Sequence, residues 1–426
     1  MSIEKDLPEL VQANIISSET ADKIALYYKA KKEKSPNRIF IAFGILGALL
    51  IGSGIILILA HNWDHLSTGI KTVLAFLPLL VAQGFGLLVI LKKQNNTAWI
   101  ESTGTFWYFA IAIAISLISQ IYNIEGSMSG FLLAWMLLAL PVIYLLRSSL
   151  VSLLYIVGIT AYVIVISNHY GDDAGIYNYW LLLMAILPFY YDLLKKKPDS
   201  NFTVFHNWVI ATSLTIALGT ITDRMEELMF AAYFSLFGVF YLLGSFDVFA
   251  QKKIRANSYL LIGGLGTVVL SIALSFKWFW EDLKEMNTNF PEIMLSPEFA
   301  ALFILSIIAI ILLYLRYKNS SLKEISPLAI MFALFIITYI IGMYSLFALI
   351  LMNVFVLIIG IYYIREGAEE NHLGMLNFGL LTLTSLIVGR FFASDLSFVI
   401  RGSVFILIGL GFFAANYWMI KKRKQQ

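Results

Sequence analysis

Two of the five histidines of the chain lie in the stretch HNWDH, residues 61–65. If a helix continues through this stretch, His61, Asp64 and His65 take positions i, i+3 and i+4 on one face. Two imidazoles and a carboxylate can exchange protons, hold a polar ligand or coordinate zinc. The stretch also follows an apolar run, where Trp63 suits the aromatic belt of a membrane boundary. We therefore expect a helix end at the interface, keep the three side chains as candidate substrate- or ion-binding residues, and predict no metal site.

Three charged residues near the C-terminus, Arg390, Asp395 and Arg401, form a second candidate set. A charge inside the hydrocarbon costs roughly 2.5–3.5 kcal/mol on insertion scales, so it usually faces the protein interior and finds a partner. Guanidinium groups match the geometry of phosphate and carboxylate. Two structural alternatives remain: Asp395 neutralises an arginine, or both arginines reach the surface. We keep all three residues as a candidate substrate- or ion-binding set.

Few other polar side chains lie inside the apolar runs. Gln83, Gln120 and Asn353 are predicted to join helices through hydrogen bonds in their interfaces, and Glu101 is expected to cap the helix that it begins. A second HNW, at residues 206–208, falls on the other side of the membrane from the first, and we interpret it as a coincidence. The chain shows no catalytic or ATP-binding motif, so we predict no catalytic residue and no cofactor.

The elements that position these residues follow from composition. Hydrophobic residues make up 59% of the chain and charged residues 13%, with a mean hydropathy of +0.81, whereas soluble proteins carry roughly 25% charge. There is no cysteine, which excludes disulfides and thiolate chemistry. We predict an all-α, polytopic integral membrane protein with about 14 transmembrane helices, because about 20 apolar residues cross the hydrocarbon core. The candidate spans are residues 39–60, 70–91, 102–121, 128–146, 149–167, 176–194, 204–221, 227–246, 257–276, 298–316, 327–341, 344–363, 374–392 and 396–418.

Three regions are expected along the chain: a cytosolic helical segment at residues 1–38, a transmembrane bundle at 39–420 and a basic cytosolic tail at 421–426. The first segment reads as two short helices, with Ser17 or Ser18 as the N-cap of the second. Its alternatives are a hairpin resting on the membrane surface and a docking module for a cytosolic partner.

Two stretches of the bundle allow more than one interpretation. Residues 327–363 are two short spans joined by a tight turn, or one broken helix. Residues 277–297 contain Trp278, Phe279 and Trp280 among charged residues, a pattern that favours a short helix lying in the membrane interface. A lid over a substrate entrance is the alternative for this stretch.

The distribution of positive charge predicts the orientation, because short cytoplasmic loops are enriched in lysine and arginine. With a cytoplasmic N-terminus and alternating spans, 24 of the 30 lysines and arginines lie on the cytoplasmic side. The six exceptions are Lys71, Arg224, Lys277, Lys284, Arg390 and Arg401. We expect both termini in the cytoplasm and no cleavable signal, since the first 38 residues are charged.

The chain resembles the bacterial family of predicted membrane proteins called domain of unknown function 2157. The resemblance rests on NIISSETADKI in the N-terminal segment, on the glycine-rich first span ending LAHNWD, and on the closing RFFASDLSFVIRGSVFILIGLGFFAANY. It covers the first 90 or so residues and the last 40 or so, and the middle matches by hydropathy. The resemblance implies a multi-spanning protein of a bacterial inner membrane and no particular activity.

Two functional hypotheses from different classes remain. The first is a secondary transporter or lipid flippase-like protein for an anionic or amphiphilic substrate, which the span count and the arginines of the last helices favour. The alternative is a membrane enzyme or envelope-assembly factor that acts at the outer face through His61, Asp64 and His65. Membrane lipids are the expected partners, and nucleic acid is not. The oligomeric state does not follow from the sequence.

Overall fold

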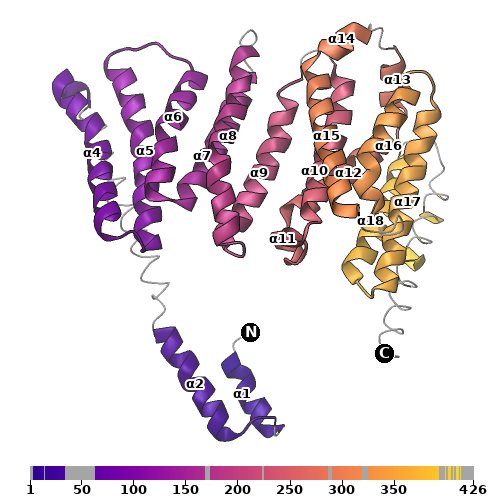
Figure 1. Cartoon of the computed structure of the whole chain (residues 1–426), viewed down its shortest axis with the longest axis horizontal. Helices are drawn as coiled ribbons and strands as arrows, with labels where there is room; N and C mark the ends of the chain where they lie inside the picture. Colours follow the sequence, from indigo (N-terminus) through magenta and orange to yellow (C-terminus); the bar gives the residue numbers. More distant parts are fainter. Residues whose placement is uncertain are drawn as a thin grey trace. The chain divides into compact units, whose positions relative to one another are not determined.

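The computed structural model describes residues 3–13, 15–33, 63–167, 173–222, 225–285, 290–318 and 325–392, together with scattered positions between 399 and 413 (Figure 1). Every regular element in these residues is a helix, as the composition predicts. The chain divides into two compact units, Met1–Leu74 and Ala75–Gln426. The expected span 39–60 and most of 396–418 lie outside the described residues.

The first unit contains the two short helices expected near the N-terminus. They are α1 (Ile3–Gln12) and α2 (Ser18–Glu33), which contact each other and bury Leu7 and Ala21. The hydroxyl of Ser17 accepts a hydrogen bond from the backbone N–H of Thr20 at 3.2 Å, so Ser17 caps α2. A short 3-10 helix, η1 (Trp63–His65), precedes α4 (Thr68–Lys92), which continues into the second unit.

The second unit begins with helices that pack around α7. In the 18-residue stretch of α7 that could span a membrane, 61% of the residues are buried, a larger share than in the spans beside it. Met136, Tyr155 and Ile159 are among the fully buried side chains of this core. The helices are α5 (Thr97–Ile121), α6 (Met128–Leu146), α7 (Ser149–Ser167), α8 (Asp173–Lys196) and α9 (Asn201–Gly219).

A second hydrophobic core surrounds α10 (Glu226–Gly244). In the 18-residue stretch of α10 that could span a membrane, 72% of the residues are buried. Phe234 stacks on Phe335 with ring centroids 4.1 Å apart, and both side chains are fully buried. The remaining helices are α11 (Asp247–Ala250), η2 (Ile254–Ala256), α12 (Ser258–Ala273), α13 (Trp278–Glu285), α14 (Phe290–Leu295), α15 (Pro297–Tyr317), α16 (Pro327–Gly342), α17 (Phe347–Glu369) and α18 (Leu373–Phe392).

Nine of the described helices are long and apolar enough to cross a membrane: α4, α5, α6, α7, α9, α10, α15, α17 and α18. The pair α12 and α13 adds a tenth if its two parts, bent by 77°, form one broken span. The shorter apolar helix α16 is separate from α17, and the two helices contact each other. Residues 327–363 are therefore two helices joined by a tight turn, the first of the two arrangements expected.

The expectation for residues 277–297 is wrong in one respect. Phe279, Trp280 and Leu283 of α13 are buried in the protein core, and only Trp278 of this aromatic group is largely exposed, at 49%. The ring of Trp280 lies against Gly342 of α16, where a Cβ atom would overlap it. The bend after α12 turns the apolar side of α13 toward α16, so Phe279 and Trp280 pack against other helices.

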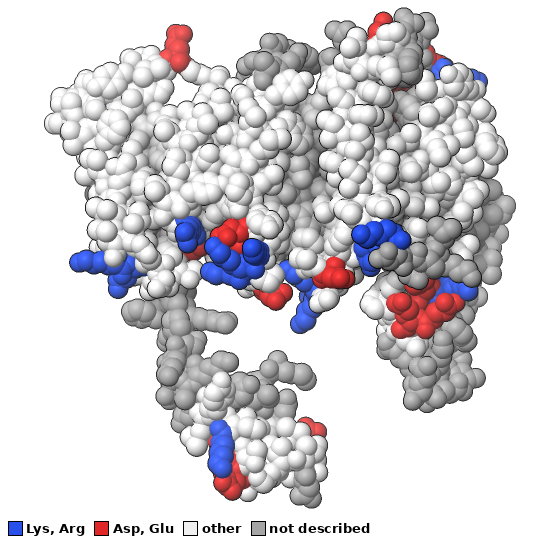
Figure 2. Space-filling view, viewed as in Figure 1, with Lys and Arg blue, Asp and Glu red and all other residues white. Residues whose placement is uncertain are grey.

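Positive charge gathers at one end of the second unit. Figure 2 shows most of its lysines and arginines along the same edge, where α4 meets α5 and α8 meets α9. We call this the basic end and define it by residues 92–93, 147, 195–197 and 252–255. Successive long helices alternate in direction, so the turn 343–346 and the α12–α13 break lie at the opposite end.

Candidate functional site

The break between α12 and α13 places several backbone carbonyls at the opposite end of the bundle. The last carbonyls of a helix lack partners within it and need donors from elsewhere. Trp280 donates its indole Nε1–H to the carbonyl of Leu274 at 2.8 Å, and the Ser275 hydroxyl donates to the carbonyl of Ile272 at 2.6 Å. Local side chains thus hold the chain in its bent conformation and leave the Ser275 carbonyl for donors from other helices.

Those donors come from Asn353 of α17 and Arg390 of α18. The amide Nδ2 of Asn353 donates to the Ser275 carbonyl at 3.1 Å and to the carbonyl of Leu349 at 2.7 Å. Arg390 also donates to the Ser275 carbonyl through Nη2. The same guanidinium donates to Oδ1 of Asn353, at 3.2 Å from Nε and 2.9 Å from Nη2. One arginine and one asparagine therefore tie three elements together.

The electrostatics of this cluster favour a cation. A helix carries partial negative charge at its C-terminus, and α12 ends at Ala273, just before the carbonyl that Arg390 contacts. The guanidinium carbon also lies 5.0 Å from the ring centroid of Phe276, within the range of a cation–π contact. Arg390 is half-buried. Its Nη1 donors remain for a ligand or for residues outside the described part of the chain.

The other charged candidates have different positions. Asp395 and Arg401 lie outside the described residues, and so does His61. Asp64 and His65 are exposed in η1, while Lys71 lies over the ring of Trp63 at 5.6 Å. Among the described residues, no group of three potential metal ligands lies close enough to hold an ion.

The three predicted interface residues differ as well. Asn353 joins α17 to the α12–α13 break and to α18. Gln83 and Gln120 are exposed on α4 and α5, so within the described chain neither lies in a helix interface. Their helices bury other faces: Ala82 of α4, next to Gln83, is fully buried, as is Ala110 of α5.

Glu101 acts on a different helix from the one expected. The helix that it begins, α5, is capped by Asn96, whose side chain accepts from the backbone N–H of Trp99. Glu101 accepts hydrogen bonds from the N–H groups of Ser149 and Leu150 at 3.0 and 2.8 Å, and from the hydroxyl of Ser148. It therefore caps the N-terminus of α7, where a negative charge is favoured.

The second core uses the same arrangement at the other end of the bundle. Glu298, in the first turn of α15, is fully buried, and its Oε1 accepts from the backbone N–H of Met225 at 3.1 Å. Met225 immediately precedes α10. Among the described spans, each of the two most buried, α7 and α10, thus begins at a carboxylate supplied by another helix.

The second HNW motif supplies three neighbouring side chains to contacts with other elements. His206 and Asn207 are fully buried. The carbonyl of Phe202 can only accept, so His206 Nδ1 donates to it at 2.7 Å, and a neutral Nε2 accepts from the Ser152 hydroxyl at 2.9 Å. Asn207 Oδ1 accepts from the hydroxyl of Tyr190 at 2.6 Å.

Trp208 completes this set by donating Nε1–H to the carbonyl of Arg255 at 3.1 Å. Consecutive residues of a helix point about 100° apart, so the three side chains reach α7, α8 and η2. The signal that identifies the motif is three consecutive hydrogen-bonding side chains within an apolar run.

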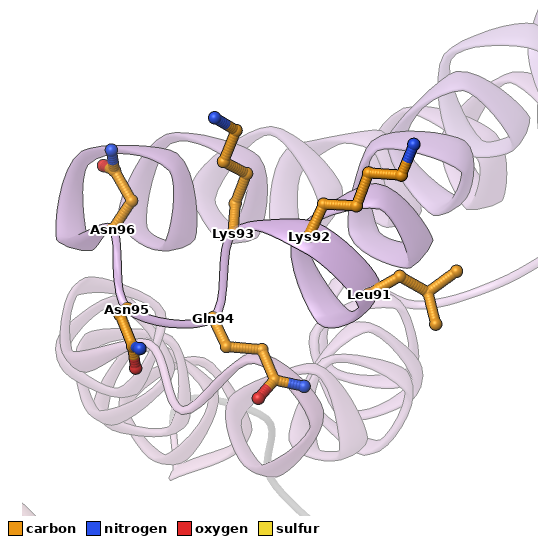
Figure 3. Close-up of a pocket in the computed structure, with 6 residues that line it drawn as sticks. All are labelled: Leu91, Lys92, Lys93, Gln94, Asn95 and Asn96. Atoms are coloured by element: carbon orange, nitrogen blue, oxygen red, sulfur yellow. The ribbon is translucent and has the colours of Figure 1, made fainter.

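A hollow of about 470 Å³ lies at the turn between α4 and α5 and is lined by residues 91–96. In Figure 3 the side-chain ends of Lys92, Lys93 and Asn96 lie on one side of the turn, and those of Gln94 and Asn95 on the other. All six lining residues are exposed. The hollow is therefore an open, basic surface.

Comparison with known proteins supports only the general class. No curated protein and no solved structure matches the chain. The family match stops before the C-terminal stretch that contains Arg390, so that part of the resemblance stays a prediction. Residues 8–152 match the family described as "Predicted membrane protein (DUF2157)", which confirms the expected resemblance from α1 to the first turn of α7.

Proposed function

We propose that this protein is a secondary transporter or lipid flippase-like protein for an anionic or amphiphilic substrate. The observation that carries the proposal is the half-buried guanidinium of Arg390, held by Asn353 and Ser275 at a broken helix. Interrupted helices supply the substrate sites of many transporters, because their free carbonyls and helix ends contact polar groups within the membrane. A guanidinium whose Nη1 group has no partner among the described residues suits a phosphate or a carboxylate.

The proposed location is the cytoplasmic membrane of a bacterium, with both termini in the cytoplasm. The gathering of lysine and arginine at the basic end supports this orientation. With this proposed orientation Arg390 lies toward the outer face, so we assign Arg390 to the contact with substrate on the outer side. Asp395 and Arg401, which follow it in the chain, remain proposed members of the same site.

Vesicles reconstituted with the full purified chain test the proposal. Phosphatidylglycerol carrying a fluorophore on an acyl chain is placed in both leaflets, and dithionite, which does not cross the membrane, bleaches only the outer one. Movement of lipid between leaflets raises the bleached fraction above that of protein-free vesicles. We expect wild-type protein to raise it and R390Q to lose most of the effect.

The control variant is R365Q, because Arg365 of α17 is 78% exposed and pairs only with Glu369 of its own helix among the described contacts. R390K separates charge from geometry, since lysine keeps the charge but not the planar fork. Equal lipid movement by wild type, R390Q and R365Q would refute the role of Arg390. If wild-type protein does not raise the bleached fraction above that of protein-free vesicles, phospholipid movement is removed from the proposal. Small organic anions then remain as the candidate substrates, and their uptake into the same vesicles tests them.

The enzyme hypothesis is not carried forward as a second proposal. It relied on convergence of His61, Asp64 and His65, and the two described members, Asp64 and His65, are exposed in a short 3-10 helix. No observation in the described part of the chain favours it over transport.

A further inference from the structure

A second cavity lies at the basic end of the bundle, at the far end of α18 from Arg390. Its volume is about 510 Å³, within the range of small-molecule sites. Along α18, Met375 at the cavity precedes Arg390 by 15 residues, which is about 22 Å at 1.5 Å per residue. The cavity is therefore distinct from the cluster at the α12–α13 break.

The walls of the cavity are mostly apolar. Leu260, Leu261 and Leu265 come from the first turns of α12, while Met375 and Phe378 come from the first turns of α18. Leu265 is 47% exposed, so this wall continues onto the surface that faces lipid. Such a surface suits a hydrocarbon chain and not a free inorganic ion.

Three hydroxyl groups bind one another beside these walls. The Tyr241 hydroxyl donates to the Ser326 hydroxyl at 2.9 Å, and the Tyr363 hydroxyl lies 2.8 Å from that of Tyr241 and 3.0 Å from that of Ser326. Tyr241 and Tyr363 line the cavity. Each hydroxyl can donate once and accept twice, so the triad satisfies its own donors and fixes α10, α16 and α17 around the site.

Lys252 and His372 add nitrogen donors to the lining. Lys252 is half-buried and donates to the carbonyl of Pro198, and an ammonium group has three donors, so further donors remain. His372 Nδ1 accepts from the backbone N–H of Met375 at 3.1 Å. In the neutral ring this contact places the proton on Nε2, which is then a second donor.

We propose that this cavity binds a phosphate-bearing amphiphile, an anionic phospholipid of the leaflet at the basic end. Its phosphate lies against Lys252 and His372, and one acyl chain follows the apolar wall of α12 and α18. Juxtamembrane cations attract anionic lipids, and here the ammonium group of Lys252 flanks an apolar cavity at the level of the first helical turns. Binding at this site does not depend on transport, so it holds even if the protein moves no substrate.

Calorimetry on the full chain in neutral detergent tests this site, with dioctanoyl phosphatidylglycerol as the probe. We expect saturable binding, and a loss of about tenfold in affinity for K252Q, which is the effect of about one charge-assisted hydrogen bond. K253Q is the matched control, because Lys253 is the exposed neighbour of Lys252 and does not line the cavity. In an R390Q background K252Q should still lower the affinity about tenfold relative to K253Q, which separates this site from the proposed transport contact.

Two further probes identify the ligand. Inorganic phosphate and dioctanoyl phosphatidylcholine should each bind at least tenfold more weakly than the anionic lipid, a difference of about 1.4 kcal/mol. Phosphate binding as tightly would make this a free-anion site, and equal binding of phosphatidylcholine would show that the headgroup charge is not recognised. Equal losses in K252Q and K253Q would mean nonspecific surface attraction.

A variant that fills the cavity provides an independent check. A Cβ at Gly264 would lie 3.6 Å from Cδ1 of Leu328, an ordinary contact, so a longer side chain there extends into the space that the acyl chain would occupy. G264L is expected to abolish lipid binding. If G264L fails to fold, K252Q and K253Q, with thermal unfolding to confirm their integrity, still decide the proposal.

Discussion

Replacing Glu101 by glutamine should weaken the fold locally at the start of α7. The carboxylate accepts from two backbone N–H groups, those of Ser149 and Leu150, and from the hydroxyl of Ser148. The glutamine side chain has the same shape but only one oxygen. One of the two carboxylate oxygens that accept hydrogen bonds in the wild type is therefore replaced by an NH₂ group, which faces a donor. Ser148 and Ser149 are buried, so water replaces the lost acceptor poorly.

The expected loss can be worked from these contacts. A hydrogen bond to a charged group contributes about 1.5–3 kcal/mol, and a charge at a helix N-terminus about 0.3–1 kcal/mol. Because Glu101 itself is half-buried, hydrogen bonds to water restore part of the lost stabilisation. We therefore expect E101Q to lower the free energy of unfolding by about 2 kcal/mol. This loss corresponds to one hydrogen bond and most of the contribution of the negative charge at the helix N-terminus.

Unfolding of the purified chain by sodium dodecyl sulfate in mixed micelles measures this difference. The matched control is E125Q, since Glu125 is exposed in the loop between α5 and α6 and should change stability by less than about 0.5 kcal/mol. Hydrogen–deuterium exchange should rise in residues 148–151 of E101Q and stay unchanged at the start of α10. Equal stability of E101Q and E125Q, with unchanged exchange at the start of α7, would refute the proposed cap.

Two other substitutions test the packing of the second core by the same unfolding measurement. In G263A the new Cβ would lie 2.6 Å from the carbonyl oxygen of Phe237, which should force α10 and α12 apart and cost about 3 kcal/mol. In G264A the new Cβ makes only ordinary contacts, so the free energy of unfolding should change by less than about 1 kcal/mol. A larger loss in G264A than in G263A would contradict this packing. W280F keeps an aromatic ring in the core but removes the indole donor at the end of α12, and it should lower the free energy of unfolding by about 1–2 kcal/mol. The control Trp278→Phe changes an exposed side chain and should lower it by less than half as much. Equal losses in the two variants would show that the indole N–H does not hold the bend.

The sequence predicts membership of the membrane class and most helix positions, because both depend on local properties. Predicted spans 128–146 and 149–167 coincide with α6 and α7. Hydrocarbon thickness sets the length of an apolar run, and capping residues such as Ser127, Ser200 and Ser296 mark where helices begin. The family resemblance near the N-terminus also depends on local sequence.

Only the tertiary structure determines which polar side chains meet. Arg390 was predicted to need a partner, but Asn353 lies 37 residues away in the chain and Ser275 lies 115 away. Glu101 was assigned to the wrong helix for the same reason. In a membrane, the faces toward lipid and toward protein are both apolar, so periodicity does not reveal which face packs. The composition of this chain therefore predicts that it lies in a membrane and that it is helical. Packing decides which face of each helix contacts another helix, and this determines where the candidate sites form.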